Sequence, residues 1–154
     1  MMGLRPWTAA DAGALLPLLT DPQVRQWTGA LSPAAWIDTV LTDAHRHSFA
    51  VVRDGAIVGN VAVKTPAPGR WEIGYWVAAP ARRQGVAAWA VEQVTGWAFT
   101  RFGMDELALL HNVANVASCG VARRCGYPLR SELPPSPGFP LPGHLHVRRA
   151  AERG

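Results

Sequence analysis

The stretch WEIGYWVAAPARRQGVA, residues 71–87, decides the fold of this chain. Aromatic and β-branched residues alternate with others from Trp71 to Val77, which predicts a strand. Pro80 ends that strand. From Val86 onward apolar residues recur every three or four positions, which predicts a helix extending to about Phe102. A strand therefore feeds a short basic turn, and the turn opens a helix.

The turn comprises Arg82, Arg83, Gln84 and Gly85, with Val86 and Ala87 at the start of the helix. The first N–H groups of a helix lack partners inside it and carry partial positive charge, so they bind phosphate well. Gly85 has no Cβ and allows a close approach of the backbone. The arginines supply forked donors suited to phosphate. An ordinary strand-to-helix connection with surface arginines would explain the turn, taken alone, equally well.

Two motifs together resemble one family. The pattern Arg82-x-x-Gly85-x-Ala87 after this strand resembles the coenzyme A-binding signature of the GCN5-related N-acetyltransferases (GNAT). The sequence of the strand resembles that found in the branch that contains the ribosomal-protein N-terminal acetyltransferases. Further along, Asn115-x-x-Ser118 and the pair Gly126-Tyr127 are similar to a second motif of the same family. The resemblance extends from about residue 4 to 131.

The length of the chain predicts a single domain over residues 1–154, and the resemblance implies an α/β fold. The implied fold has three layers, with a mixed, splayed sheet of six or seven strands flanked by about four helices. The cosubstrate would be acetyl-coenzyme A, with its pyrophosphate on residues 82–87. Its pantetheine arm would lie between strands 71–77 and 106–111 and pair with main chain near Trp76 and Val77. Asn115 would bind the arm or main chain beside it.

The resemblance also implies transfer of an acetyl group directly to an amine. Glu72 is the first expected base and His111, at the end of a strand, is the second; Glu72 could equally be a surface residue of a strand. Many members carry a thiol-protonating tyrosine four residues after the small residue, where this chain has Ala122. Ser118 is then the available hydroxyl.

The acceptor is left open by the sequence. A protein N-terminus is the first expectation, and an antibiotic or polyamine-like small molecule is the alternative. A non-catalytic acyl-CoA-binding module is a third reading, because the tyrosine is missing. Residues 24–29, before the second helix, are expected to contact the acceptor. A homodimer is usual among proteins of this kind.

Composition narrows the class of protein further. Of 154 residues, 49% are hydrophobic and 17% charged, with a net charge of +4. These values are typical of a globular chain. No run of Lys and Arg exceeds two residues, so no nucleic-acid partner is expected. The N-terminus has no long apolar segment, which predicts neither a signal peptide nor a membrane span. Cys119 and Cys125 are expected to be reduced thiols in the cytoplasm.

Local signals predict the remaining elements. A strand at residues 4–7 precedes a helix capped by Thr8 and Asp11, and Asp21-Pro22 ends that helix. Ser32-Pro33 starts the second helix. Asp54-Gly55 joins strands 48–53 and 57–64 in a hairpin. The chain continues with a strand at 106–111, a helix at 112–124, a Pro-rich loop at about 132–143 and a last strand at about 141–147.

The pair His144-x-His146 could suggest a metal site. Neither a cysteine nor a carboxylate stands near it in the sequence. Two histidines in a strand are more common than a metal centre, so no metal is expected.

Overall fold

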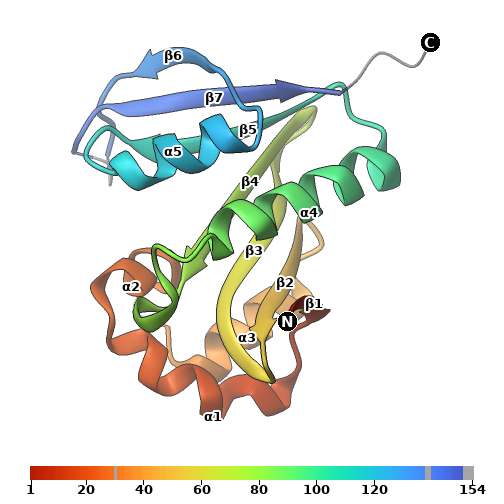
Figure 1. Ribbon diagram of the computed structural model, residues 1–154, viewed down its shortest axis with the longest axis vertical. Coiled ribbons are helices and arrows are strands. Elements are labelled where there is room, and N and C mark those ends of the chain that lie inside the picture. Colours follow the sequence, from red (N-terminus) through yellow and green to blue (C-terminus); the bar gives the residue numbers. More distant parts are fainter. Residues whose placement is uncertain (30, 138–139, 151–154) are drawn as a thin grey trace. The chain divides into compact units, whose positions relative to one another are not determined.

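The computed structural model describes residues 1–29, 31–137 and 140–150. In these residues seven strands form one mixed sheet in the order β1-β2-β3-β4-β5-β7-β6 (Figure 1). The strands are β1 (Met2–Pro6), β2 (Arg46–Arg53), β3 (Ala56–Ala67), β4 (Arg70–Val77), β5 (Glu106–Asn112), β6 (Leu129–Leu133) and β7 (Gly143–Arg149). The α-helices are α1 (Ala12–Leu15), α2 (Pro22–Thr28), α3 (Pro33–Thr42), α4 (Val86–Phe102) and α5 (Val116–Arg124). The expected α/β fold is confirmed.

The chain forms two compact units. The first comprises Met1–Ala62 and Tyr75–Ala90, and the second comprises Val63–Gly74 and Val91–Gly154. Strands β3 and β4 and helix α4 pass from one unit into the other. The expectation of a single domain stays a prediction.

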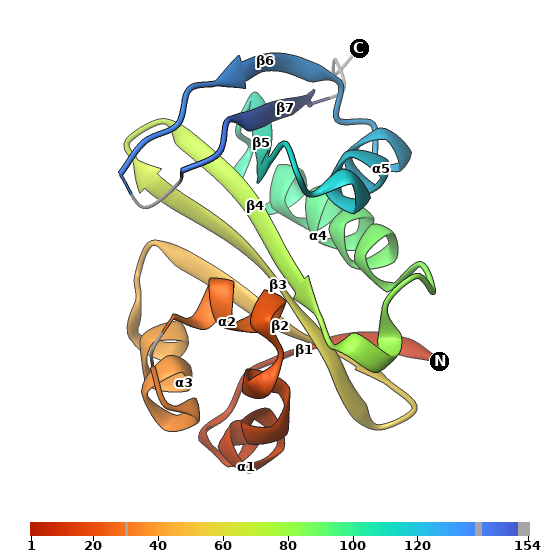
Figure 2. The ribbon, with the colours of Figure 1, turned by 90° about the vertical axis from the view of Figure 1, so that its left-hand side faces the viewer.

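In the first unit, α1, α2 and α3 lie on one face of β2 and β3 (Figure 2). Three buried tryptophans fill the core there. The ring of Trp7 lies edge-on to that of Trp36, with centroids 5.0 Å apart, and Trp76 packs 6.1–6.2 Å from both. Aromatic pairs of this geometry add about 0.5–1.5 kcal/mol to the burial of their surface. One tryptophan each from β4, α3 and the segment after β1 thus joins these elements.

The N-terminal helices differ from the sequence-based expectation. Asp21-Pro22 begins α2 and does not merely end the helix before it, because the Asp21 carboxylate accepts hydrogen bonds from the N–H groups of Gln23 (3.0 Å) and Val24 (3.2 Å). The single helix expected before it is split into 3₁₀ turns around the short α1. Pro17 has no N–H to donate and lies in the second of these turns, at Leu16–Thr20.

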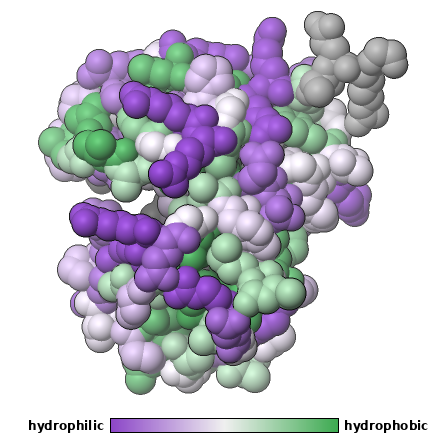
Figure 3. Space-filling view, viewed as in Figure 1, coloured by the Kyte–Doolittle hydropathy of each residue, from purple (hydrophilic) through white to green (hydrophobic). Residues whose placement is uncertain are grey.

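Some apolar residues of these helical segments are exposed. Leu16 is 61% exposed, because the 3₁₀ turn has a different period from an α-helix. Leu41, near the end of α3, is 53% exposed. Figure 3 shows hydrophilic surface mixed with smaller apolar areas on one face of the molecule. Single exposed apolar side chains of this kind are normal on protein surfaces.

In the second unit, α5 lies over strands β5 and β7 (Figures 1 and 2). Strand β5 pairs with β7 antiparallel over its whole length, and β6 continues the sheet beyond β7. Strand β4 pairs with β5 parallel, with Glu72 opposite Ala108 and Ile73 opposite Leu109. Strand β6 was missed from the sequence, and β7 begins at Gly143, two residues later than expected.

The hairpin and the end of α4 follow their sequence signals. Asp54 and Gly55 have φ of 51° and 83°, as the expected two-residue turn requires. Gly103 ends α4 with φ of 67°, and its N–H donates to the carbonyl of Phe99.

We predict opposite effects for two glycine substitutions. A Cβ on Gly59 would lie 2.6 Å from the carbonyl oxygen of Trp76, whereas a Cβ on Gly96 of α4 would meet nothing within 4 Å. Gly59→Ala should therefore lower the free energy of unfolding by about 1–3 kcal/mol, and Gly96→Ala should raise it by about 0.5–1 kcal/mol. Urea unfolding measures both. Equal effects of the two changes would contradict the close approach of β3 to Trp76.

A second prediction concerns pH. The Asp11 carboxylate accepts bonds from the Arg5 guanidinium (2.8 and 2.9 Å) and from the N–H of Thr8 (2.8 Å), which confirms the expected Thr8–Asp11 cap. The Arg5 bond lowers the pKa of Asp11 to about 2. Stabilisation by the charged form is therefore present above about pH 4 and is lost as the pH falls through about 2.

Asp11→Asn should lower the free energy of unfolding at pH 7 by about 1–2 kcal/mol, allowing for the partial exposure of Arg5. The difference from the wild type should shrink between about pH 4 and pH 2 in urea titrations. Asp38→Asn, on the exposed side of α3, should change little. A loss at Asp11 that is constant with pH would contradict the ionic origin.

Candidate active site

The turn between β4 and α4 has a defined backbone path. The N–H of Ala78 donates to the carbonyl of Val58 (2.8 Å), and a 3₁₀ turn follows at Ala79–Ala81. Arg83 and Gly85 then take positive φ, 62° and 79°. The N–H of Trp89 donates to the carbonyl of Gly85 (3.1 Å), which starts α4. The exposed turn thus leads directly into the N-terminus of a 17-residue helix.

Gly85 is required by its φ and not by crowding, since a Cβ there would meet nothing within 4 Å. Arg83 and Gln84 are also exposed, whereas Val86 is 2% exposed and anchors the helix in the core. The turn therefore offers open backbone and side-chain donors at the positive end of the α4 dipole, which is suitable for an anion.

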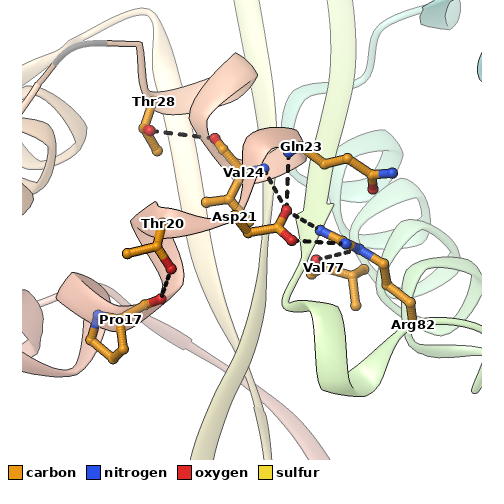
Figure 4. Close-up of polar contacts among 8 residues, drawn as sticks. All are labelled: Pro17, Thr20, Asp21, Gln23, Val24, Thr28, Val77 and Arg82. Atoms are coloured by element: carbon orange, nitrogen blue, oxygen red, sulfur yellow. Dashed lines mark hydrogen bonds and ion pairs between the residues drawn. The ribbon is translucent and has the colours of Figure 1, made fainter.

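Arg82 holds the turn in place (Figure 4). Its Nε donates to the carbonyl of Val77 (3.1 Å), and its two terminal nitrogens bind the two carboxylate oxygens of Asp21. The Arg82 bond lowers the pKa of Asp21 from its ordinary value. Asp21 thus caps α2 and binds Arg82 with one carboxylate. In this structure the guanidinium of Arg82 is engaged inside the protein, and its expected contact with phosphate stays a prediction.

Gln84 supports the turn on its other side. Its amide nitrogen donates to the carbonyl of Pro80 (3.0 Å), and its amide oxygen accepts from Arg53 (2.6 Å). Trp76 contributes its indole to the aromatic core, and in the described residues its Nε1 has no partner. The expected binding of a pantetheine arm by the main chain of Trp76 and Val77 stays a prediction.

The expected proton-handling residues lie in the second unit. Glu72 on β4 accepts a bond from Arg70 (2.7 Å) and is 19% exposed. Ser118 is 5% exposed, and its N–H donates to Oδ1 of Asn115 (3.2 Å). Asn115 is thus the N-cap of α5. The helix begins at Val116 and not at 112, because two asparagine side chains form a capped turn before it.

The phenol of Tyr127 is buried and bonded to the Thr95 hydroxyl (2.6 Å). Burial raises the pKa of Tyr127 far above its ordinary value. Ala122, at the position where the resemblance would place a tyrosine, is fully buried. Neither the buried phenol of Tyr127 nor Ala122, which has no hydroxyl, offers an exposed donor, and the expected role of Ser118 as the donor stays a prediction.

His111 lies in a cluster that the sequence did not reveal. Its side chain meets Cys119, His144 and His146, and one nitrogen or sulfur atom of each lies within 4.8 Å of the others. The reason for expecting no metal at His144-x-His146 was the lack of a cysteine nearby, and this premise is wrong because α5 brings Cys119 to the histidines. Both cysteines are free thiols, as expected. Burial lowers the pKa of His111 and His146, which favours neutral imidazoles at pH 7.

The two caps that begin α2 and α3 allow the contribution of Arg82 to be measured. Ser32 and Asp21 each cap a helix that starts with proline, but only Asp21 also binds Arg82. Ser32→Ala should lower the free energy of unfolding by about 1 kcal/mol. Asp21→Ala should lower it by about 2–4 kcal/mol, because the charged bond to Arg82 is lost as well. If urea unfolding shows equal losses of free energy for the two variants, the ion pair between Asp21 and Arg82 contributes nothing to stability.

The sequence profile of the acetyltransferase (GNAT) domain matches residues 2–128. A search of curated proteins found no match. In the part of the chain that the structure describes, no helix has the length and apolar character needed to cross a bilayer.

Three solved structures share the fold. A proposed ribosomal-protein-serine acetyltransferase from Vibrio cholerae has a TM-score of 0.80 at 23% identity, over 97% of this chain and 94% of the other. The microcin C7 self-immunity acetyltransferase MccE, solved with acetyl-CoA and AMP, has a TM-score of 0.84 at 17% identity, over 97% and 92%. RimL, the ribosomal L7/L12 α-N-protein acetyltransferase solved with coenzyme A, has a TM-score of 0.82 at 16% identity, over 96% and 93%. At these sequence identities the solved structures show only that the fold is shared. The family is shown by the sequence profile, which matches most of the chain. This chain belongs to the GNAT acetyltransferase family.

Proposed function

We propose that the protein transfers an acetyl group from acetyl-coenzyme A to a primary amine, by direct attack in a ternary complex. The turn from Arg83 to Ala87 carries this proposal, because it presents exposed backbone at the N-terminus of α4 with Gly85 in the left-handed region. A pyrophosphate there would accept main-chain N–H bonds and the charge of Arg83. The main chain of Trp76 and Val77 would bind the pantetheine arm.

The reaction needs a neutral amine. The amine nitrogen attacks the thioester carbonyl carbon, the carbon–sulfur bond breaks, and the thiolate of coenzyme A leaves and takes a proton. At pH 7 deprotonation costs about 4–5 kcal/mol for a lysine but only about 1 kcal/mol for an α-amino group. A protein N-terminus therefore needs only a modest base. We assign the role of the base to Glu72, or to His111 when the Nε2 lone pair of His111 is available, and either residue would act through water. We assign Ser118 as the donor of the proton to the thiolate.

A protein N-terminus is the acceptor that we propose first. Two of the structures described above carry the names of ribosomal-protein acetyltransferases. MccE, an immunity acetyltransferase, supports a small-molecule amine as the alternative. Arg25 and Gln26 of α2 are exposed and lie within the expected acceptor segment at residues 24–29. A homodimer in the cytoplasm is the setting that we expect.

The coenzyme site can be tested by thermal unfolding with and without acetyl-coenzyme A. A ligand at about 100 times its dissociation constant stabilises the folded state by about 2.7 kcal/mol. Gly85→Glu should abolish the shift, because it places a carboxylate where the pyrophosphate binds. Gly69→Glu is the matched control: Gly69 has φ of 76° against 79° for Gly85, and a Cβ at either position meets open space. The control should keep the wild-type shift.

Loss of the shift in both variants would mean that strain or charge in general, and not the turn, controls binding. No shift of the wild type at millimolar ligand would contradict the coenzyme site. Release of free thiol that depends on a peptide amine would support the enzyme. Binding without turnover across peptides and small amines would favour the non-catalytic module, for which the buried Ala122 in place of a tyrosine is the motivating observation.

A further inference from the structure

We propose that His111, Cys119, His144 and His146 form a tetrahedral binding site for a divalent metal of the zinc class. All four residues lie in the second unit, on β5, α5 and β7. None of the four belongs to the turn that we assign to coenzyme A, and the inference does not depend on the proposed acetyl transfer.

The pairing of the strands brings the histidines together. His111 of β5 lies directly opposite His144 of β7 in the antiparallel register, and His146 follows two residues later on the same face. Helix α5 lies over these strands and supplies Cys119 (Figures 1 and 2). Four ligands from three elements therefore converge within 4.8 Å although 35 positions separate His111 from His146 in the sequence.

Hydrogen bonds to backbone carbonyls fix the protonation of two of the rings. Nδ1 of His111 lies 2.7 Å from the carbonyl of Asn112, and Nδ1 of His146 lies 3.1 Å from the carbonyl of Tyr127. A carbonyl only accepts, so each Nδ1 carries the hydrogen. In a neutral ring the Nε2 then holds a lone pair. Metal-bound histidines are oriented in this way by outer carbonyls.

The two Nε2 atoms face each other across 2.9 Å. Two lone pairs at that distance repel each other unless a proton or a metal ion lies between them. His146 is 2% exposed, so bulk water has little access to its ring. A divalent cation shared by all the ligands removes this repulsion.

The distances around Cys119 agree with tetrahedral coordination. Zinc bonds of about 2.0–2.1 Å to nitrogen and 2.3 Å to sulfur place neighbouring ligands about 3.3 Å (N to N) and 3.6 Å (N to S) apart. The sulfur of Cys119 lies 3.3 Å from His111 Nε2, 3.5 Å from His144 Nδ1 and 3.9 Å from His146 Nε2. Only small movements would therefore bring the four atoms onto one ion.

Three imidazoles and a thiolate are ligands that zinc binds well, and Mg²⁺ prefers oxygen. With four protein ligands the site is closed, as in structural zinc sites. The bound metal would join α5 to β5 and β7. It would also occupy the Nε2 lone pair of His111, so the protein with metal bound would need a base other than His111 for acetyl transfer.

The test is titration of the metal-stripped full-length protein with Zn²⁺ and Co²⁺, with Mg²⁺ as the negative control. We expect one Zn²⁺ per chain, a rise in the unfolding temperature with Zn²⁺, and a cobalt spectrum with a thiolate charge-transfer band and intense tetrahedral d–d bands. Cys119→Ser should abolish the charge-transfer band. His144→Ala should weaken Zn²⁺ binding by more than about 100-fold, beyond the effect of losing an outer-shell partner.

Cys125→Ala and His45→Ala are the matched controls, because each removes one residue of the same type outside the cluster. Both should keep the wild-type affinity and cobalt spectrum. Circular dichroism of each metal-free variant checks that it is folded. If Cys119→Ser does not fold, His144→Ala, which changes a partly exposed residue, provides the test. Absence of Zn²⁺ binding by the wild type, or binding that survives in the two cluster variants, would overturn the proposal. So would loss of binding in either control.

Discussion

The ion pair between Arg82 and Asp21 is the interaction on which the proposed coenzyme site depends. It joins the start of α2 to the turn after β4, and the third bond of Arg82, to the carbonyl of Val77, fixes where the strand ends. The pair is partly buried, so each partner would lose solvation if the other were removed. The turn can therefore keep Gly85 in the left-handed region and present its backbone before any ligand arrives, which lowers the ordering cost of binding.

Much of this arrangement was readable from the sequence because it is local. The strand at 70–77, the turn and the long helix are consecutive, and the change of hydrophobic period from two to 3.6 marks their junction. Asp54-Gly55 and Ser32-Pro33 are also short-range signals with a direct steric or hydrogen-bonding cause. The same logic applied to Asp21-Pro22 would have found α2, since it is the same cap followed by the same residue.

The remaining features depend on residues that are distant in the sequence. The partner of Arg82 lies 61 positions away, and nothing near either residue marks the pair. Strand β6 is short and mostly exposed, and it is defined by its pairing with β7 and not by its own pattern. The cluster around His111 follows from a strand register that places His144 opposite it and from a helix that adds Cys119. Composition and spacing could not supply that register.

Amide hydrogen exchange of the full-length protein tests the central claim most directly, with acetyl-coenzyme A compared against S-acetylpantetheine, which lacks the phosphates. If the N–H groups at the start of α4 hold the pyrophosphate, acetyl-coenzyme A will slow exchange at residues 83–88, and S-acetylpantetheine at saturation will leave those amides unchanged. Equal protection by both ligands, or protection by acetyl-coenzyme A only at places other than this turn, would contradict the account.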